Sequence, residues 1–445
     1  MTNPGGLTKQ FDGPLPEAVD VVVIGAGVAG TASAYFLARR GVKVLLAEKG
    51  VVAAEQSSRN WGWVRQQGRD WAELPIMMEA NRIWRGLAEE TGEDGLTFIE
   101  AGNVTLIADQ AGLARAEAFR ELSMRHQLET RILSREETAQ RFGGVGGDWI
   151  AAMETPSDGR GEPFAAVPAL ARAARNAGAV VIEDCAVRTV DLAGGRVAGV
   201  VTEKGRVRCE RVLLAGGAWS THFAHNAGVD LPQLAVRSTV ARTEPAPDAY
   251  ANNFATPGLY LRRRADGGYS VSSGDLAEHY ISRASFRYLT KFTKLLKVSA
   301  KDVKLHLAAP KGYPGAWGAP TRWSADDVSP FERMRILNPD PSPIVVRRIE
   351  ERLPQRFPAL QGVRLAQAWA GMIDVTPDAV PTLGESTEVP GLYIATGLSG
   401  HGFGIGPAVG RIMADVMSGR DSGHDINRFR PNRFFDGSPI EPGPY

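Results

Sequence analysis

The 445-residue sequence has little of what disulfide-stapled, metal-dependent or nucleic-acid-binding proteins need. Only two cysteines occur, Cys185 and Cys209, and their spacing fits no metal-ligand motif. The seven histidines are scattered and form no HExxH-type pair, so we expect no metal site. A formal net charge of +1 argues against a broad basic surface for nucleic acid.

Long apolar runs are missing as well. Residues 1–17 are polar and contain Pro and Gly, without the apolar segment of a secretory signal. No window approaches the roughly 18 apolar residues of a membrane-spanning helix. We therefore expect a soluble, cytoplasmic protein. Hydrophobic residues make up 43% and charged residues 23%, which is ordinary for a globular enzyme, and the length favours two intertwined domains.

A glycine motif near the N-terminus predicts a nucleotide-binding unit. Residues 21–24 form a short β-branched run typical of a buried strand, and the sequence GAGVAG follows at 25–30. A stretch rich in helix formers comes next, and a second apolar strand ends at Glu48. Strand, turn, helix, strand and acid stand in the order that a dinucleotide fingerprint requires.

Each part of this motif has a physical task. Gly25 permits a tight turn, Gly27 lets the backbone approach a pyrophosphate, and Gly30 allows the helix to lie close to the strand. The N–H groups at the helix start favour phosphate. Glu48 is placed to accept hydrogen bonds from a ribose diol, which favours an unphosphorylated ribose.

Three features favour FAD over NAD. The fingerprint occurs once, so a second nucleotide domain for NAD(P)H is not evident. Apolar strands at 212–214 and 392–396 each run into small residues, AGGAWS and then the loop SGHGFGIG at 399–406. That loop precedes an amphipathic helical stretch at 407–417 and can direct several N–H groups at a flavin ring. A plain strand-turn-helix connection is the alternative.

Residues 21–48, 55–63, 215–220 and 400–402 together resemble the D-amino-acid oxidase superfamily, which includes sarcosine oxidase, glycine oxidase and D-amino-acid dehydrogenases. The resemblance extends from about residue 20 to residue 430. Dispersed runs are similar to bacterial L-amino acid deaminases: 55–59, 83–87, 185–188, 201–205 and 265–267. The 400–403 loop instead resembles sarcosine oxidase and the D-amino-acid enzymes.

The resemblance implies that FAD is bound without a covalent link, because neither cysteine lies in the C-terminal loop. The residues expected to hold it are Gly25, Gly27, Val28, Ala29, Gly30, Glu48, Lys49, Ser57, Ser58, Arg59, Trp61, Gly62, Val187, Ala215, Gly216, Gly217, Trp219, Gly371, Gly400, His401, Gly402, Phe403 and Gly404. Arg59 has the alternative of a structural pair.

A carboxylate-bearing substrate needs an arginine, whose planar guanidinium binds a carboxylate in bidentate fashion. By resemblance to the deaminases, Arg262 in the predicted strand at 259–264 is one candidate; a solvated hairpin edge is the alternative. Arg65 resembles a substrate-binding arginine of sarcosine oxidase and is the second candidate.

Three further positions have two interpretations each. His401 could orient substrate or stabilise the reduced ring, or it could fill a polar packing niche. Trp61 and Trp63 could form walls of the substrate pocket or belong to the core. Asp374 and Asp378 lie in a segment like the superfamily loop that borders the flavin, and we assign them to turn formation and not as bases.

Basic residues recur at helical spacing in 285–305 among apolar side chains. This pattern predicts an amphipathic helical insertion that can be interrupted near Ser299. Its basic face is either solvated or docks to an anionic membrane surface or an electron acceptor.

These features predict an α/β (α+β) fold, in which a Rossmann-like FAD-binding domain carries an inserted, mainly antiparallel β substrate domain. The expected FAD-binding segments are 16–93, 155–226 and 367–430, the substrate segments are 94–154 and 227–366, and 431–445 is a tail. The expected chemistry is hydride transfer from an amino acid, imino acid or N-substituted amine to flavin N5, followed by imine hydrolysis. Oxygen or a quinone would reoxidise the flavin. An FAD-dependent 2-hydroxy acid dehydrogenase and an FAD-binding subunit of a heteromeric amine oxidase are the alternatives.

Overall fold

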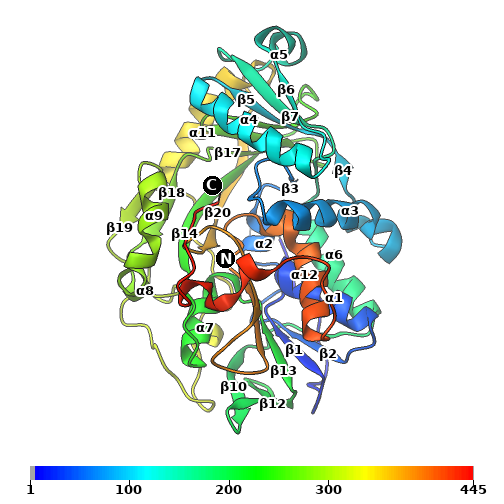
Figure 1. The fold of residues 1–445 in the computed structure, drawn as a ribbon, viewed down its shortest axis with the longest axis vertical. Helices are drawn as coiled ribbons and strands as arrows, with labels where there is room; N and C mark the ends of the chain where they lie inside the picture. Colours follow the sequence, from blue (N-terminus) through cyan, green and yellow to red (C-terminus); the bar gives the residue numbers. More distant parts are fainter. Residues whose placement is uncertain (1–5, 444–445) are drawn as a thin grey trace.

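The computed structural model describes residues 6–443; the first five residues of the polar N-terminal segment and the last two of the 431–445 tail lie outside the described residues. Two large sheets of different kinds lie toward opposite ends of the long axis (Figure 1). The predicted mixed α/β fold with an inserted, mainly antiparallel sheet is confirmed.

The first sheet is parallel except at one edge. Its strand order is β21-β22-β13-β1-β2-β9, and only β21 runs antiparallel to its neighbour. The strands are β1 (Val21–Ile24), β2 (Val44–Ala47), β9 (Val180–Ile182), β13 (Arg211–Leu214), β21 (Thr382–Glu385) and β22 (Leu392–Thr396). Strands β1 and β2 are buried on both faces, as the β-branched and leucine runs in the sequence predict.

Alternate side chains of β1 enter two different cores. Val21 and Val23 pack with helices α1 (Val28–Arg39), α3 (Glu73–Thr91), α6 (Pro163–Asn176) and α12 (Gly402–Met417). Val22 and Ile24 pack on the other face. That face is covered by a three-stranded sheet of β10 (Val187–Ala193), β11 (Arg196–Thr202) and β12 (Gly205–Arg208) and by α7 (Ser220–Asn226).

Two helices from opposite ends of the chain pack closely together over the first sheet. In Figure 1 the blue α1 and the orange-red α12 lie side by side. A Cβ added at Gly406 would come within 2.4 Å of the Val28 side chain, and one added at Gly410 would come within 2.4 Å of Ala32 Cβ. These glycines therefore set the short distance between the two helix backbones.

The second sheet follows the order β19-β18-β14-β17-β16-β15-β5-β7-β6, with β20 paired to β14, and most of its neighbours are antiparallel. Its strands are β5 (Asn103–Ile107), β6 (Arg131–Leu133), β7 (Ala151–Thr155), β14 (Leu234–Thr243), β15 (Asn253–Thr256), β16 (Leu259–Arg263), β17 (Tyr269–Ser272), β18 (Ala277–Tyr280), β19 (Val303–His306) and β20 (Leu365–Val375). A separate small sheet has the strand order β3 (Trp63–Val64), β8 (Gly159–Arg160), β4 (Ile99–Glu100).

The other α-helices are α2 (Gln56–Arg59), α4 (Gln110–Arg125), α5 (Arg135–Phe142), α8 (Arg283–Arg287), α9 (Leu289–Ser299), α10 (Pro330–Arg333) and α11 (Pro343–Arg356). Short 3-10 turns occur at Asp94–Leu96, Gly217–Trp219, Pro358–Leu360, Asn427–Phe429 and Pro431–Phe434. Within residues 6–443, no helix has both the length and the apolarity needed to cross a membrane.

Several expected boundaries differ in the structure. Helix α12 starts at Gly402, five residues before the predicted stretch, so the glycines of the loop form its first turn. The expected division between residues 366 and 367 falls inside β20, which pairs along its length with β14. In the predicted helical insertion at 285–305, α8 and α9 are helical and the expected interruption near Ser299 is confirmed, but the helical prediction beyond it is wrong, because Val303–His306 form β19, which pairs with β18.

Candidate cofactor and substrate site

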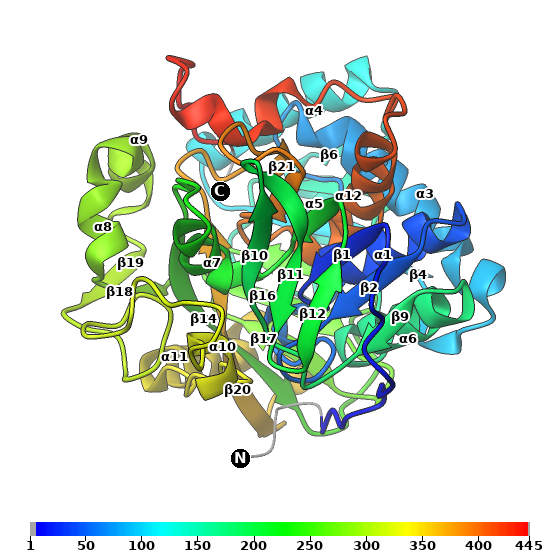
Figure 2. The same ribbon diagram turned by 90° about the horizontal axis from the view of Figure 1, so that it is seen from below.

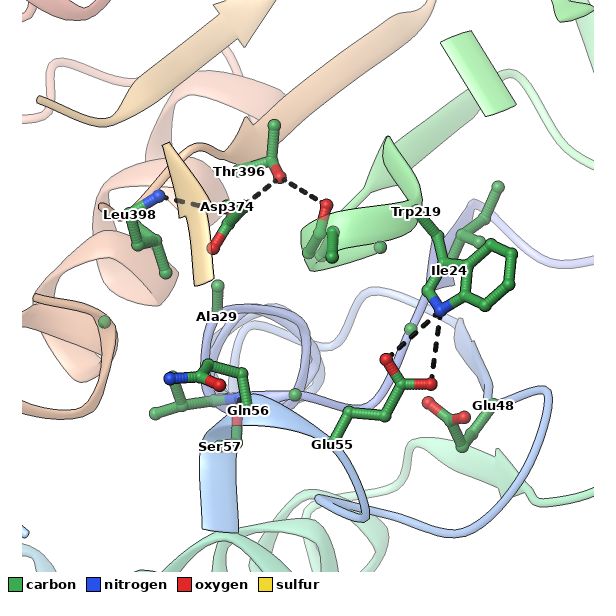
Figure 3. Close-up of a pocket in the computed structure, with 18 of the residues that line it drawn as sticks. Ile24, Ala29, Glu48, Glu55, Gln56, Ser57, Trp219, Asp374, Thr396 and Leu398 are labelled. Atoms are coloured by element: carbon green, nitrogen blue, oxygen red, sulfur yellow. Dashed lines mark hydrogen bonds between the residues drawn. The ribbon is translucent and has the colours of Figure 1, made fainter. Parts of the chain in front are cut away.

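A cavity opens at the carboxyl ends of β1, β2, β13 and β22, where Ile24, Ala47, Leu214 and Thr396 contribute to its wall (Figure 3). Ligands bind at this edge of open α/β sheets. The predicted cofactor residues that line it are Gly25, Gly27, Val28, Ala29, Glu48, Lys49, Ser57, Val187, Ala215, Gly216, Gly217, Trp219, Gly400, Gly402 and Phe403.

The glycines of the first turn have the geometry that their predicted tasks require. Gly25 has φ +98°, and a Cβ there would lie 2.7 Å from Ala215 O. A Cβ at Gly30 would lie 2.0 Å from Gly25 O, so only glycine lets α1 pack against the turn. Gly27 begins the helix without a side-chain cap, and Val28 N donates to Ser57 Oγ at 2.9 Å. The start of α1 therefore lies at the cavity without a cap from Gly27 itself, and Ser57 takes the hydrogen bond of its first N–H group.

Glu48 stands at the end of β2 with its carboxylate fixed by the backbone. Oε2 accepts a hydrogen bond from Ala26 N and Oε1 accepts one from Gly50 N, both at 2.8 Å. Burial raises the pKa of this carboxyl, while Lys49 and the two N–H groups oppose the shift. Each oxygen keeps a further lone pair, so the group can also accept from a diol in the cavity.

Beside Glu48, the side chain of Glu55 is held in place by Trp219 and Lys49. Trp219 Nε1 donates to both Glu55 oxygens, at 3.2 and 3.1 Å, as Figure 3 shows. Lys49 Nζ donates to Glu55 Oε1 at 2.5 Å and lies 4.8 Å from the centre of a Trp219 ring. These contacts hold the Lys49 ammonium group against Glu55 and Trp219 in the wall of the cavity.

Asp374 is the functional residue that the sequence interpretation missed. It is not in a turn, as we predicted, but in β20, and it is buried (Figure 3). Its Oδ2 accepts from Gly397 N at 2.7 Å and from Thr396 Oγ1 at 3.1 Å. Burial raises the pKa of this carboxyl against those hydrogen bonds. Asp374 thus fixes the bend that joins β22 to α12, whereas Asp378 forms a buried ion pair with Arg433.

Eight of the predicted cofactor residues do not line the cavity: Gly30, Ser58, Arg59, Trp61, Gly62, Gly371, His401 and Gly404. Arg59 is fully buried and donates to Ala54 O, Ala370 O and Asn338 Oδ1. These contacts support the structural alternative for Arg59. A Cβ at Gly371 would lie 2.1 Å from Gln56 Oε1, and this amide oxygen is buried without a hydrogen-bond partner.

Arg262, the first candidate for carboxylate binding, already binds a carboxylate of the protein. Its Nη1 donates to Glu162 Oε1 at 2.7 Å and its Nη2 donates to Glu162 Oε2 at 3.1 Å. The side chain is 1% exposed, so the alternative of a solvated hairpin edge is wrong. Neither Arg262 nor Arg65 lines the cavity, and the role of Arg262 as a substrate ligand stays a prediction that the ion pair with Glu162 opposes.

Arg65, the second candidate, has no acidic partner within ion-pair distance among residues 6–443. Its guanidinium carbon lies 5.7 Å from the centre of a Trp63 ring. Burial lowers the pKa of Arg65, and Tyr260, Asp158 and Glu73 partly restore it. Arg69 also has no acid within ion-pair distance among residues 6–443. It donates from Nε to Arg65 O at 3.0 Å, while its Nη1 is buried without a hydrogen-bond partner. Burial and the nearby Arg65 lower the pKa of Arg69 to about 9.

Aromatic side chains surround Arg65. The ring centres of Trp61 and Tyr260 lie 5.0 Å apart in an edge-to-face arrangement. The ring centre of Trp63 lies 5.5 Å from that of Trp61 and 5.6 Å from that of Tyr260. Trp63 is buried and Trp61 half-buried, so Trp63 belongs to the core while Trp61 keeps accessible surface. The cluster combines a cation with flat apolar walls.

His401 precedes the first residue of α12 and binds an acid from α3. Its Nδ1 lies 3.2 Å from Oε1 of the fully buried Glu73, to which it can donate. Burial and Arg69 lower the pKa of His401, while Glu73 opposes the shift. The same contact keeps the pKa of Glu73 below its usual value, although burial acts the other way. His401 thus links the C-terminal loop to α3, and its role toward substrate stays a prediction.

Cys185 and Cys209 are both free and buried, and neither lines the cavity. Burial raises the pKa of Cys185 to about 11 and that of Cys209 to about 12. In the part of the chain that the structure describes, no group of three His, Cys, Asp or Glu side chains is arranged to hold a metal ion.

The cavity fits a dinucleotide. It combines glycines whose Cβ atoms would collide with backbone, the N-terminus of α1, and a fixed carboxylate at the end of β2. The orphaned Gln56 Oε1 can accept a hydrogen bond from an N–H of a bound ring. Fold and cavity together define a dinucleotide-binding α/β protein.

Comparison with known proteins narrows this class. The family described as FAD dependent oxidoreductase matches residues 20–416. L-amino acid deaminase from Proteus myxofaciens, solved with anthranilate, is 33% identical with a TM-score of 0.90, and the match covers 96% of each chain. The Proteus vulgaris deaminase is 31% identical with a TM-score of 0.90, over 96% of this chain and 100% of that one. Mitochondrial sarcosine dehydrogenase of Mus musculus is 26% identical over 429 residues, 94% of this chain and 42% of that protein.

The chain belongs to the FAD dependent oxidoreductase family, and its cofactor is FAD. It spans less than half the length of the first curated relatives that it matches.

Proposed function

We propose that this chain oxidises the C–N bond of an amino acid whose carboxylate binds Arg65. The observation that carries the proposal is the difference between the two candidate arginines. The Arg262 guanidinium already forms an ion pair with the Glu162 carboxylate, whereas no acid within residues 6–443 pairs with Arg65. A half-buried guanidinium without an acid gains most from a carboxylate ligand, because a charge-assisted bidentate pair replaces lost hydration.

The chain's own residues would bind and orient the substrate. Arg65 holds the carboxylate, and Trp61 and Tyr260 offer flat surfaces to a substrate side chain. Arg69 adds a second buried positive charge behind Arg65, which further favours an anionic group. Large apolar or aromatic amino acids fit such walls best.

FAD would be held by the start of α1, by Glu48 and by the bend that Asp374 fixes. When bound, the flavin supplies the oxidising chemistry by accepting the substrate's hydride. The chain's task is to place the α-carbon of the substrate near the ring and to keep the carboxylate fixed there. The resulting imine is then hydrolysed by water.

The relatives support this substrate class. Proteins of similar fold over nearly the whole chain are L-amino acid deaminases, and one was solved with anthranilate, which carries both an amine and a carboxylate. A sarcosine dehydrogenase is among the curated relatives. Binding of FAD without a covalent link fits the distance of both cysteines from the cavity lining.

The electron acceptor, oxygen or a quinone, and the cytoplasmic location stay predictions. The segment 285–305 also stays a candidate for contact with a membrane surface. Large apolar side chains of this segment are exposed, with Phe286 64%, Leu289 51% and Val298 68% accessible. The exposed Lys294 and Lys297 lie among them, and this mixture is typical of surfaces that contact anionic lipid.

Anaerobic mixing of the holoenzyme with a panel of compounds tests the proposal. L- and D-amino acids, N-methylated amino acids and 2-hydroxy acids are added separately, and the visible flavin absorbance is followed. We expect bleaching by at least one amino acid with a large apolar side chain. Bleaching by a 2-hydroxy acid alone would replace this function with the hydroxy-acid dehydrogenase, with His401 as the residue to test as its base.

A further inference from the structure

A second cavity adjoins the cofactor cavity, and the proposed function does not use it. Its volume is about 380 Å³, within the range of small-molecule sites. Ala218 and Met372 line both cavities. Ala218 follows the AGG turn after β13, and Met372 lies two residues before Asp374 in β20. A ligand in the second cavity is therefore separated from the cofactor cavity by single side chains.

The walls of this cavity combine aromatic rings with polar groups that lack a protein partner. Tyr280 and Tyr313 contribute rings, which lie 6.0 Å apart edge to face. Among residues 6–443, neither His225 nor Arg283 has a side-chain hydrogen bond or an ion pair, although both line the cavity. By contrast, His279 is held by Ala235 O and Ser285 Oγ, at 2.9 and 2.8 Å.

His225 is suited to act as a neutral donor. Burial lowers its pKa, and the nearby Arg322 and Arg287 lower it further. A neutral imidazole and a guanidinium can each donate to a carbonyl oxygen of a ligand. Flat aromatic walls with such donors match a ring that carries carbonyl groups.

Three exposed apolar side chains lie on the surface beside residues that line the cavity, and we call them its mouth: Phe286, Leu307 and Trp317. Phe286, between the lining residues Ala284 and Arg287, is 64% exposed, and Trp317, next to Ala316, is 47% exposed. Their rings lie 6.3 Å apart. Leu307, whose carbonyl accepts from Trp317 Nε1 at 3.2 Å, is 87% exposed. Figures 1 and 2 both show α8 and α9 at one edge of the molecule, away from α1 and α12. An apolar ligand drawn from a lipid phase would meet this rim first.

We infer that the second cavity binds a quinone, which takes the electrons from the cofactor cavity through the wall at Ala218 and Met372. This inference rests on the proposed function. Oxidation of the amine to an imine releases two electrons and two protons. The quinone takes up both, and its two carbonyl oxygens become the hydroxyls of a quinol.

Binding of ubiquinone-1 to the oxidised holoenzyme, without substrate, gives the first test. Tryptophan fluorescence reports the Kd in the wild type and in Ala284→Trp, which fills the cavity, and Arg283→Met, which removes a donor. We expect Kd to rise about tenfold or more in both variants. For Arg283→Met this is the loss typical of one hydrogen bond to a charged group, and for Ala284→Trp the added indole takes the space of the ligand. Arg82→Met is the matched control, because Arg82 is an exposed arginine on α3, away from this cavity.

Reoxidation of the flavin gives the second test and separates this inference from the amine assignment. The holoenzyme is reduced with dithionite without oxygen, so no amino acid is needed, and ubiquinone-1 is then added. We expect the reoxidation rate constant to fall in Ala284→Trp and Arg283→Met and to stay unchanged in Arg82→Met. Equal rates and equal Kd values in all four proteins, or no binding by the wild type, would overturn the inference. Failure of every amino acid to reduce the flavin would overturn only the proposed substrate class.

The mouth is tested with the double variant Phe286→Ser/Trp317→Ser. With long-chain ubiquinone in phosphatidylglycerol vesicles, we expect slower flavin reoxidation than in the wild type, whereas the Kd for soluble ubiquinone-1 should be unchanged. An unchanged rate with vesicles would show that the quinone does not enter past this rim.

Discussion

Arg262 and Glu162 form a bidentate ion pair between the two large sheets of the molecule. Arg262 comes from β16 of the second sheet, and Glu162 is the residue before α6, which covers the first sheet. Arg262 Nη1 also donates to Gly161 O at 3.1 Å. Because Arg262 is 1% exposed, the pair is a structural bond across the boundary between the cofactor-binding and substrate-binding parts.

Substitution Arg262→Met should therefore reduce stability. We expect the free energy of unfolding to fall by about 2 kcal/mol, because the partly buried Glu162 loses its ion-pair partner and keeps only the hydrogen bond from Ala265 N. Chemical denaturation measures the change. Arg364→Met is the control, since Arg364 is 80% exposed in its pair with Glu244 and should cost less than about 0.5 kcal/mol. A stable Arg262→Met protein with a raised KM would instead make Arg262 the substrate ligand.

Substitution Arg65→Met should raise KM for the amino acid about 10- to 100-fold, because a hydrogen bond between two charged groups is worth about 1.5–3 kcal/mol. Because no acidic partner of Arg65 would be left unpaired, the melting temperature and the FAD content should stay near those of the wild type. Arg65→Lys should lie in between, because lysine keeps the charge and loses the bidentate geometry. An unchanged KM in Arg65→Met would exclude this arginine as the carboxylate ligand.

Gly30→Ala should abolish or strongly weaken FAD binding, because the added Cβ would lie 2.0 Å from Gly25 O in the turn that faces the cavity. The FAD-to-protein absorbance ratio after dialysis measures this loss. Gly86→Ala is the matched control: Gly86 lies in α3, is exposed, and has no atom within 4 Å of an added Cβ. That control should keep FAD and gain about 0.5–1 kcal/mol in stability.

Asp374→Ala should loosen the bend between β22 and α12. It removes the acceptor of the buried Gly397 N, and such an unsatisfied group costs about 1–3 kcal/mol, whereas Thr396 Oγ1 keeps Ser220 Oγ and Gln233 Oε1 as acceptors. We expect a lower melting temperature and faster hydrogen exchange at residues 396–398. Asp374→Asn, which retains one carbonyl oxygen, should show a smaller effect. Equal exchange in Asp374→Ala and the wild type would contradict the assigned role.

Asp158 should make the stability depend on pH. Burial raises its pKa from 3.8 to about 6, although Gln66 and Gln67 donate hydrogen bonds to it. Between these two values the folded state binds more protons than the unfolded state, so this residue's contribution makes stability fall as pH rises from about 4 to about 6. Asp158→Asn should remove that component of the slope in unfolding titrations. Parallel curves for the two proteins would contradict it.

The sequence predicted the nucleotide cradle well because its signals are local. The GAGVAG turn needs positive φ at Gly25 and close packing at Gly30, and no other residue type meets both demands. The same local interpretation failed at Asp374, whose role depends on β20 of the second sheet passing beside the bend after β22 of the first sheet, a tertiary contact that no local pattern reports. The pairing of Arg262 with Glu162 was missed for a similar reason. The three consecutive arginines at 262–264 suggested either a solvated hairpin edge or an arginine free to bind substrate. The partner of Arg262, Glu162, is 100 residues away in the sequence.

The glycine contacts between α1 and α12 bear on how the protein is made. Residues near position 30 emerge from the ribosome long before Gly406 and Gly410 are synthesised, so the nascent cradle lacks one of its covering helices for most of translation. A chain ended before residue 402 would therefore carry the nucleotide motif yet leave one side of it open to water.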